Sequence, residues 1–168
     1  MATASLNYAA ATAITIGSAS LASSSTFVVG RESTEVDNTT NEYIDVLLEG
    51  FETVGTTPTA DTEIRVYAWG SHTSLATAAK DDLDGADGTR TISSAGARDS
   101  FMVRVATIRV DAATSDHKYH YGPISLRDIF GEIPQYRGIF VTHNTGVNLN
   151  STAGNHEHKY TGIKYDSL

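Results

Sequence analysis

The sequence predicts an all-β protein, a single antiparallel β-sandwich with a jelly-roll-like character. Short segments that alternate apolar and polar residues, or are rich in β-branched residues, recur along the chain and are typical of strands. Gly, Pro, Asn and Asp separate these segments at irregular spacing, as in turns. Only residues 126–130 have the pattern of a short helix. The 168 residues suffice for one domain with a buried core, and we divide them into an N-terminal segment, 1–30, and a β-sandwich domain, 31–168.

Two strands are expected over residues 43–49 and 62–69. Gly50 follows the first strand and indicates a β-bulge that redirects it. In the second strand, alternation directs Ile64, Val66 and Ala68 inward and Arg65, Tyr67 and Trp69 outward. The two outward aromatic residues would suit an interface, and cover by a loop of the same chain is the alternative.

Residues 101–110 form the strongest predicted strand. Because apolar residues fall on both of its faces, we place it centrally in a sheet. The preceding residues, 70–100, form a long excursion rich in Gly, Ser, Thr and Asp. Further strands are expected over 117–121, 138–143 and 156–165.

Signals at both ends bound the predicted helix. Ser125 and Asp128 match a capping box in which Asp takes the place of Glu. Gly131 is typical of a helix stop. The helix is therefore expected over 126–130.

Residues 1–30 contain no charged side chain, since Arg31 is the first base and Glu32 the first acid. A solvated tail is normally rich in charge. The segment is therefore either an extended arm that lies on another surface as an added strand, or the first strand of the same domain. Its candidate interface residues, to be added to Tyr67 and Trp69, are Leu6, Tyr8, Ile14, Ile16 and Phe27.

The composition excludes several classes of function. The chain has no cysteine, which excludes disulfides and thiolate metal sites. Its net charge is −8, and the basic face that nucleic acid requires is missing. No apolar run is long enough to span a membrane. Because no basic segment precedes the first apolar residues, we expect synthesis in the cytoplasm without a cleaved signal.

Two histidines on the last predicted strand are the sharpest candidate for a metal site. His156 and His158 lie two residues apart, which places both imidazoles on one face, and His143 is a candidate third ligand. Metal-binding jelly rolls of the cupin type also need a Gly before the first His and a Glu after the second, where this chain has Asn150 and Thr161. We therefore interpret these histidines as exposed polar residues and predict no metal and no cofactor.

The acidic residues 81–88 resemble a calcium-binding loop in composition. Counted as an EF-hand from Asp82, the pattern fails at Ala86, Asp87 and Ser93. A solvated turn cluster is the simpler interpretation, and a calcium site of another kind is the alternative. The motifs G-x-S-x-G, G-x-x-x-x-G-K-[ST] and G-x-G-x-x-G do not occur in the sequence. We therefore expect that the protein is not an enzyme.

Several stretches resemble a virion structural protein of tailed bacteriophages, of the small β-sandwich type that decorates or cements the capsid. They are VDNTTNEY (36–43), TTPTA (56–60), IRVY (64–67), YGPIS (121–125), IFG (129–131), GIFVTHNTGV (138–147) and AGNH (153–156). These are packing and turn positions and do not form a chemical motif.

The resemblance implies a structural role in many copies. A capsid decoration protein, or cement protein, sits on the outside of the head, contacts the major capsid protein where subunits meet, and is expected to be a homotrimer. Localisation on the virion, at the capsid surface, is implied with it. Two alternatives remain, a tail, neck or fibre component of the phage particle, and a module that binds carbohydrate or the host surface through Trp69 and Tyr67.

Overall fold

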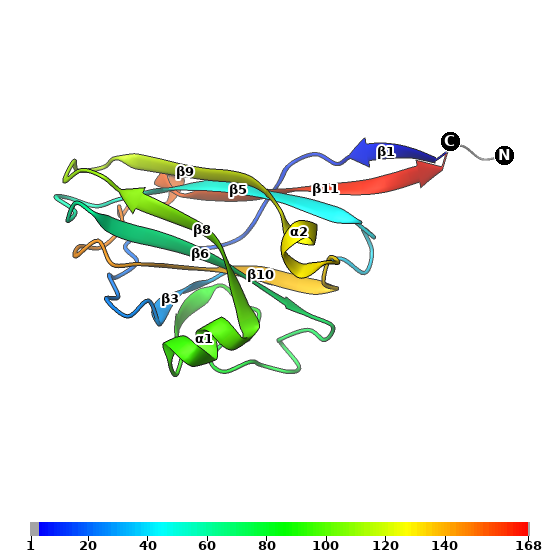
Figure 1. Ribbon diagram of the computed structural model, residues 1–168, viewed down its shortest axis with the longest axis horizontal. Helices are drawn as coiled ribbons and strands as arrows, with labels where there is room; N and C mark the ends of the chain where they lie inside the picture. Colours follow the sequence, from blue (N-terminus) through cyan, green and yellow to red (C-terminus); the bar gives the residue numbers. More distant parts are fainter. Residues whose placement is uncertain (1–3, 168) are drawn as a thin grey trace.

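The computed structural model describes residues 4–167 as two antiparallel sheets packed face to face (Figure 1). The first sheet has the order β1-β11-β5-β9, with β2 also paired to β11. Its strands are β1 (Ala4–Tyr8), β2 (Thr12–Ala13), β5 (Asp45–Thr53), β9 (Lys118–Ser125) and β11 (Glu157–Ser167). The predicted all-β sandwich is confirmed.

The second sheet has the order β7-β3-β10-β6-β8, with β4 also paired to β10. Its strands are β3 (Val29–Glu32), β4 (Val36–Asp37), β6 (Thr62–Ser71), β7 (Gly88–Thr91), β8 (Met102–Val110) and β10 (Tyr136–His143). Two short α-helices, α1 (Ala95–Phe101) and α2 (Leu126–Phe130), and a 3₁₀ turn, Ala153–Asn155, join strands at the periphery.

The main core lies between the sheets. Val46 and Leu48 of β5 face Ile64 and Val66 of β6, and all four are fully buried. The pairing of β5 with β9 shifts register between Leu48 and Gly50, at the position that Gly50 indicated. The extra residue of this bulge lies on β9, between Tyr121 and Ile124, whereas β5 itself stays in unbroken register with β11. The alternation read from the sequence therefore places the inner face of the first sheet correctly.

Helix α2 begins and ends where the sequence predicted. The Ser125 side chain accepts a hydrogen bond from the backbone N–H of Asp128 at 3.1 Å. Gly131 follows the helix with φ +81°, a left-handed conformation that favours glycine. Leu126 is buried against the main core.

Tyr67 and Trp69 point to the outer face of the second sheet as predicted, but their role as exposed interface residues is wrong. Both are buried, Tyr67 at 2% and Trp69 at 0% exposure. They belong to a second core cluster, and its other members come mostly from the segment that follows β6: Leu75, Leu83, Ile92, Met102 and Phe140. The 72–101 segment folds back over the outer face of the second sheet (Figure 1), so the alternative of cover by the same chain is the one observed.

The central position predicted for residues 101–110 is also wrong, because β8 lies at the edge of its sheet. Its apolar residues on both faces have a local cause. The pairing with β6 shifts register between Val66 and Tyr67, so the inner-facing positions of β8 change from odd to even numbers. Met102, before the shift, packs in the second core cluster, whereas Ile108, after it, packs in the main core.

The N-terminal segment contributes strands to its own chain. Within residues 4–30, β1 and β2 pair with β11 and the chain then enters the second sheet through β3. Residues 1–3 of the predicted arm lie outside the described residues. β11 pairs with β5 only as far as Ile163, and beyond it β11 pairs with β1 alone. β1 and the end of β11 therefore form a two-stranded ribbon that projects from the body (Figure 1).

The burial of Trp69 predicts a spectroscopic result, because it is the single tryptophan of the chain. We expect blue-shifted native fluorescence with little quenching by acrylamide, and a red shift on unfolding in guanidinium chloride. A native emission typical of an exposed indole would contradict the packing of the 72–101 segment.

A glycine substitution tests the same packing energetically. A Cβ on Gly138 would lie 2.4 Å from Cζ2 of Trp69, so Gly138→Ala should lower the free energy of unfolding by about 1–3 kcal/mol. Gly154→Ala is the matched control, because a Cβ there meets nothing within 4 Å. Equal denaturation midpoints for the two variants would count against the contact.

Candidate interaction site

The outer edge of β1 is the least protected sheet edge in residues 4–167. An unpaired edge strand presents free N–H and C=O groups, and proteins normally block such edges with charges, proline, bulges or covering segments. β1 consists of Ala-Ser-Leu-Asn-Tyr and has neither charge nor proline. Within the described part of the chain, β1 pairs only with β11. Its other edge is therefore free to pair.

The other three edges carry protective features. β9 contains Lys118 and Pro123, and it carries the extra residue of the bulge opposite Leu48 and Gly50. β8 carries Arg104 and Arg109. The outer edge of β7 is covered by the acidic loop, where Asp82 accepts a hydrogen bond from the backbone N–H of Thr91 at 2.9 Å. The contrast singles out β1 as an edge that is left open.

The ribbon also concentrates exposed apolar side chains. The large hydrophobic residues with substantial exposure are Leu6 (51%), Tyr8 (58%), Val103 (43%) and Tyr165 (62%), and all but Val103 lie on β1 or the end of β11. Leu6 lies directly opposite Tyr165, and Tyr8 lies opposite Ile163. Directly opposed residues share one face of a sheet, so these side chains form one apolar strip.

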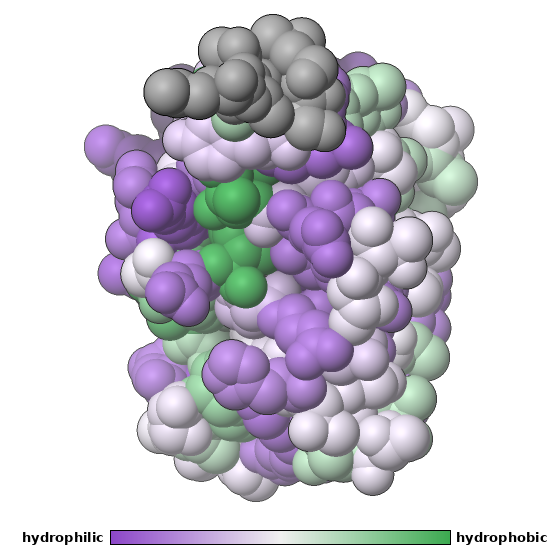
Figure 2. All heavy atoms as spheres, turned by 90° about the vertical axis from the view of Figure 1, so that its right-hand side faces the viewer, coloured by the Kyte–Doolittle hydropathy of each residue, from purple (hydrophilic) through white to green (hydrophobic). Residues whose placement is uncertain are grey.

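A groove lies next to this strip. It has a volume of about 370 Å³ and is lined by Tyr165 together with Tyr43, Ile44, Arg127, Glu132 and Ile133. Figure 2 views this end of the molecule and shows strongly hydrophobic residues between polar neighbours. We call the outer edge of β1, the strip of Leu6, Tyr8 and Tyr165, and this groove the ribbon site.

The predicted interface residues divide into two groups. Leu6 and Tyr8 lie in the ribbon site, whereas Ile14 and Phe27 are buried in the monomer and Ile16 is partly buried against the main core. Phe27 packs beneath the guanidinium of Arg65, with Cζ 3.6 Å from the ring centroid. These three residues and the two aromatic residues of β6 therefore serve the packing of this chain.

Sequence reasoning missed Tyr165 and the groove. The alternation of Ile163 and Tyr165 in the last strand was the available signal for an apolar face. The groove has no comparable signal, because Tyr43, Ile44 and Ile133 belong to segments far apart in the sequence.

The histidines proposed as metal candidates form a buried polar cluster, so their interpretation as exposed strand residues is wrong. His158 is 1% exposed and the side chain of His156 is 2% exposed. Both contact the carboxylate of Glu52 on β5, which is fully buried. His156 Nδ1 contacts Glu52 Oε2, and His158 Nε2 lies 2.8 Å from Oε1.

The hydrogen bonds of this cluster determine its charges. His156 Nε2 lies 2.8 Å from the carbonyl oxygen of Asn150, so both of its nitrogens face acceptors and the ring must be protonated. His158 Nδ1 lies 2.8 Å from the hydroxyl of Tyr121. The cluster therefore holds the Glu52 carboxylate against the imidazolium of His156.

The pKa shifts agree with this assignment. Burial alone would raise the pKa of Glu52, but the hydrogen bonds from His156 and His158 lower it to about 2. Burial alone would lower the pKa of His156, but the hydrogen bond to Glu52 raises it above its ordinary value of 6.5. Opposite charges favour the ionised form of each partner.

His143 lies apart from this cluster. Its Nε2 is 2.9 Å from the carbonyl oxygen of Leu21, and its Nδ1 is 2.9 Å from the hydroxyl of Thr145. Burial lowers the pKa of His143, which leaves a neutral ring that donates from Nε2 to Leu21 and accepts at Nδ1 from the backbone N–H of Thr145. The structure therefore does not bring the three histidines together around one point.

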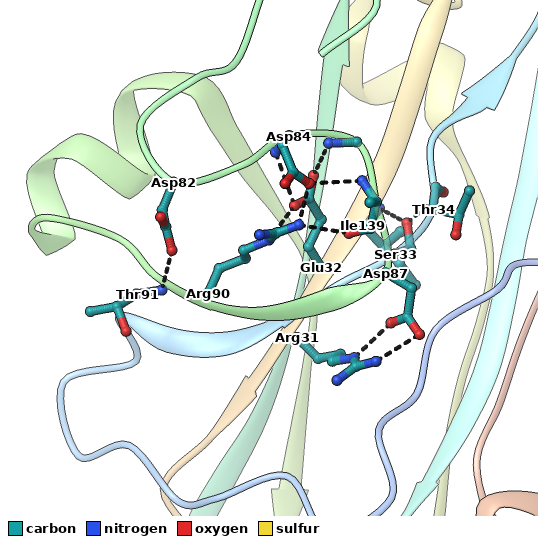
Figure 3. Close-up of polar contacts among 12 residues, drawn as sticks. Arg31, Glu32, Ser33, Thr34, Asp82, Asp84, Asp87, Arg90, Thr91 and Ile139 are labelled. Carbon is teal, nitrogen blue, oxygen red and sulfur yellow. Dashed lines mark hydrogen bonds and ion pairs between the residues drawn. The ribbon is translucent and has the colours of Figure 1, made fainter. Parts of the chain in front are cut away.

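The acidic residues 81–88 fasten a loop to the body (Figure 3). Asp87 accepts two hydrogen bonds from the Arg31 guanidinium, at 2.6 and 2.7 Å. Asp84 contacts Arg90, which also donates to the buried Glu32 at 2.8 Å. Among residues 4–167, no group of three or more His, Cys, Asp and Glu is arranged to hold a metal ion. The carboxylates of this loop face donors of their own chain.

The buried cluster predicts how stability depends on pH. Glu52 stabilises the fold above its ordinary pKa of 4.5 and loses that contribution as the pH falls toward 2. His156 stabilises the fold below 6.5 and loses its contribution as the pH rises through its raised pKa. We expect the cluster to stabilise most between about pH 4.5 and 6.5, measured as the urea midpoint against pH. A titration of the His156 ring by NMR with a pKa below 6.5 would contradict the assignment.

Removing the central carboxylate isolates its contribution. Glu52→Gln leaves the imidazolium of His156 buried without its partner, and we expect a loss of about 3–5 kcal/mol in the free energy of unfolding. Glu157→Gln is the control, because Glu157 lies on the same strand as His158 and its ion pair with Lys159 is solvent-exposed. Similar small losses for both variants would refute the cluster's contribution.

Comparisons with known proteins show no relative: no family model matches the chain, and no match was found among curated proteins or solved structures. Within residues 4–167, no helix is long and apolar enough to cross a membrane.

Proposed function

We propose that the protein is a structural component of a phage virion that binds the outside of the capsid through the ribbon site and bridges neighbouring capsid subunits. The single observation that carries this proposal is the open edge of β1 with its exposed apolar strip. The sequence resemblance to capsid decoration proteins supplies the class of partner, the major capsid protein.

An open edge strand supports attachment by strand addition. In this mode, main-chain hydrogen bonds provide affinity and alternate side chains enter pockets of the partner. Leu6 and Tyr8 are alternate residues of β1 and lie on one face. The absence of charge in β1 removes a desolvation cost from such pairing.

The body of the molecule suits a clamp. A protein that binds the assembled shell better than its dissociated subunits stabilises the shell by mass action. The Glu52 cluster and the Arg31–Asp87 pair join segments distant in sequence, which favours a body that keeps its shape under load. A homotrimer with closed threefold symmetry would present three ribbons to the shell.

The alternatives from the sequence are a tail, neck or fibre component and a carbohydrate-binding module. A tail, neck or fibre component would use the same ribbon site on a different part of the particle, and copy number separates it from a decoration protein. A sugar-binding platform built on Tyr67 and Trp69 has lost its support, because both rings are buried.

Attachment should depend on the outward backbone of β1. The N–H of Ala9 donates to the carbonyl of Gly162, and N–H groups alternate along a strand, so the N–H of Leu6 points away from β11. Leu6→Pro removes that donor without removing a bond to β11, and we expect unchanged folding but weakened sedimentation with heads of the encoding phage. Leu6→Ala separates the loss of the side chain from the loss of the N–H.

An aspartate substitution tests the apolar strip. Tyr8→Asp should weaken binding to heads by at least about tenfold, because it places a charge in the proposed contact. Val103→Asp is the matched control, since Val103 is similarly exposed but lies on the charged β8 edge. Equal loss of binding for both variants would refute the ribbon site.

Quantitative mass spectrometry of purified virions tests the location. A decoration protein is expected at high copy number in tailless heads as well as in whole particles. Presence only on tails, or in very few copies, would favour the tail or fibre alternative. Complete absence from particles would overturn the proposal.

A further inference from the structure

Arg137 carries a buried positive charge without a hydrogen-bonded counterpart. It lies on β10, where its backbone pairs with Gly70 of β6 and Val36 of β4, and the residue is 3% exposed. Neither Nη1 nor Nη2 has a hydrogen-bond partner among the described residues. A guanidinium donates only and stays protonated in proteins, so both groups need acceptors that the described chain does not provide.

Arg98, the other buried arginine among the described residues, has the hydrogen-bond acceptors that Arg137 lacks. Arg98 is 4% exposed, and its guanidinium contacts the carboxylate of Asp99 at 2.8 and 3.0 Å and the carbonyl oxygen of Phe27 at 2.9 Å. Arg137 has instead the ring of Tyr160, with Cζ 5.1 Å from the centroid. A cation–π contact offsets part of the cost of burial but leaves the N–H groups unbonded.

Asp37 does not supply the acceptor. Asp37 acts on Arg137 through its charge, but its Oδ1 accepts a hydrogen bond from the backbone N–H of Thr39 at 2.7 Å. Burial lowers the pKa of Arg137, as expected for a cation in apolar surroundings. An uncompensated buried charge is among the most costly features a fold can contain.

The space beside Arg137 limits what can complete the site. Arg137 lines a cavity of about 10 Å³ between the sheets, and the other walls are almost entirely apolar, including Val36, Val46, Leu126 and Ile139. This volume accommodates roughly one particle of the size of water. A carboxylate or phosphate group is too large for it. A water molecule would accept hydrogen bonds, whereas a monatomic anion would also neutralise the charge.

From this geometry we propose that Arg137 is an internal binding site for a single halide ion, chloride under ordinary conditions. The guanidinium supplies the charge and the two Nη donors, and the small volume of the cavity excludes larger anions. The site is independent of the ribbon site and of the proposed function, because none of its lining residues belongs to the ribbon site.

Ion-specific stability tests the proposal with the whole chain. Unfolding is measured in sodium chloride and in sodium gluconate at equal ionic strength. Above saturation, each tenfold increase in chloride should lower the unfolding equilibrium constant about tenfold, while gluconate should not. Arg137→Met should abolish the difference between the salts, and Arg109→Met, which removes an exposed charge, should retain it.

Crystals soaked in sodium bromide locate the ion directly. An anomalous peak within hydrogen-bond distance of Arg137 Nη1 or Nη2 is expected. If the site holds only a water, with no bromide peak and with equal stability in both salts, the proposal is overturned. Because Arg137→Met can also change stability by itself, the decisive comparison is the salt dependence within each variant.

Discussion

The buried carboxylate of Glu52 joins β5 to the start of β11 through His156 and His158, beside the backbone ladder of the two strands, and the ribbon site depends on β11. A buried carboxylate is tolerated only when it is paired and hydrogen-bonded, and here two histidines and a tyrosine complete the network. β11 then continues past the end of β5 and carries β1 away from the body. A polar cluster inside the sheet thus anchors an apolar strip outside it.

The sheet edges of the molecule differ in how well they are protected against pairing with another chain, and this difference points to the ribbon as the site of interaction. Charges, a proline, bulges and the acidic loop protect three edges, and the fourth has none of them in the described chain. An open edge is a hazard for aggregation unless a partner covers it. The proposed attachment to a shell gives that edge a partner, and it explains why exposed apolar residues gather on the same ribbon.

Local sequence patterns predicted a large part of the fold. Alternation located β5 and β6, and Ser125 with Gly131 bounded α2. Gly50 marked the position of a register shift, although the extra residue lies on β9. The errors arose where both faces of a strand are apolar. Such a strand is predicted to lie centrally in a sheet. β8 instead lies at an edge, and a register shift places its apolar residues on both faces. Leu6 and Tyr8 of the candidate site followed from the charge-free segment, whereas Tyr43, Ile44 and Ile133 could not be assembled from separate segments.

The sequence by itself determined the all-β class, the principal strands and the absence of thiol chemistry, because these depend on residue type and on short-range periodicity. Only the tertiary structure decided which aromatic residues are exposed, since the 72–101 segment covers Tyr67 and Trp69 while β1 and β11 leave Tyr8 and Tyr165 uncovered. It also decided that the histidines of the last strand meet Glu52, and that Arg137 meets no acceptor among the described residues. Exposure and charge pairing are set by residues distant in sequence, and a pattern along one strand does not specify what packs against it.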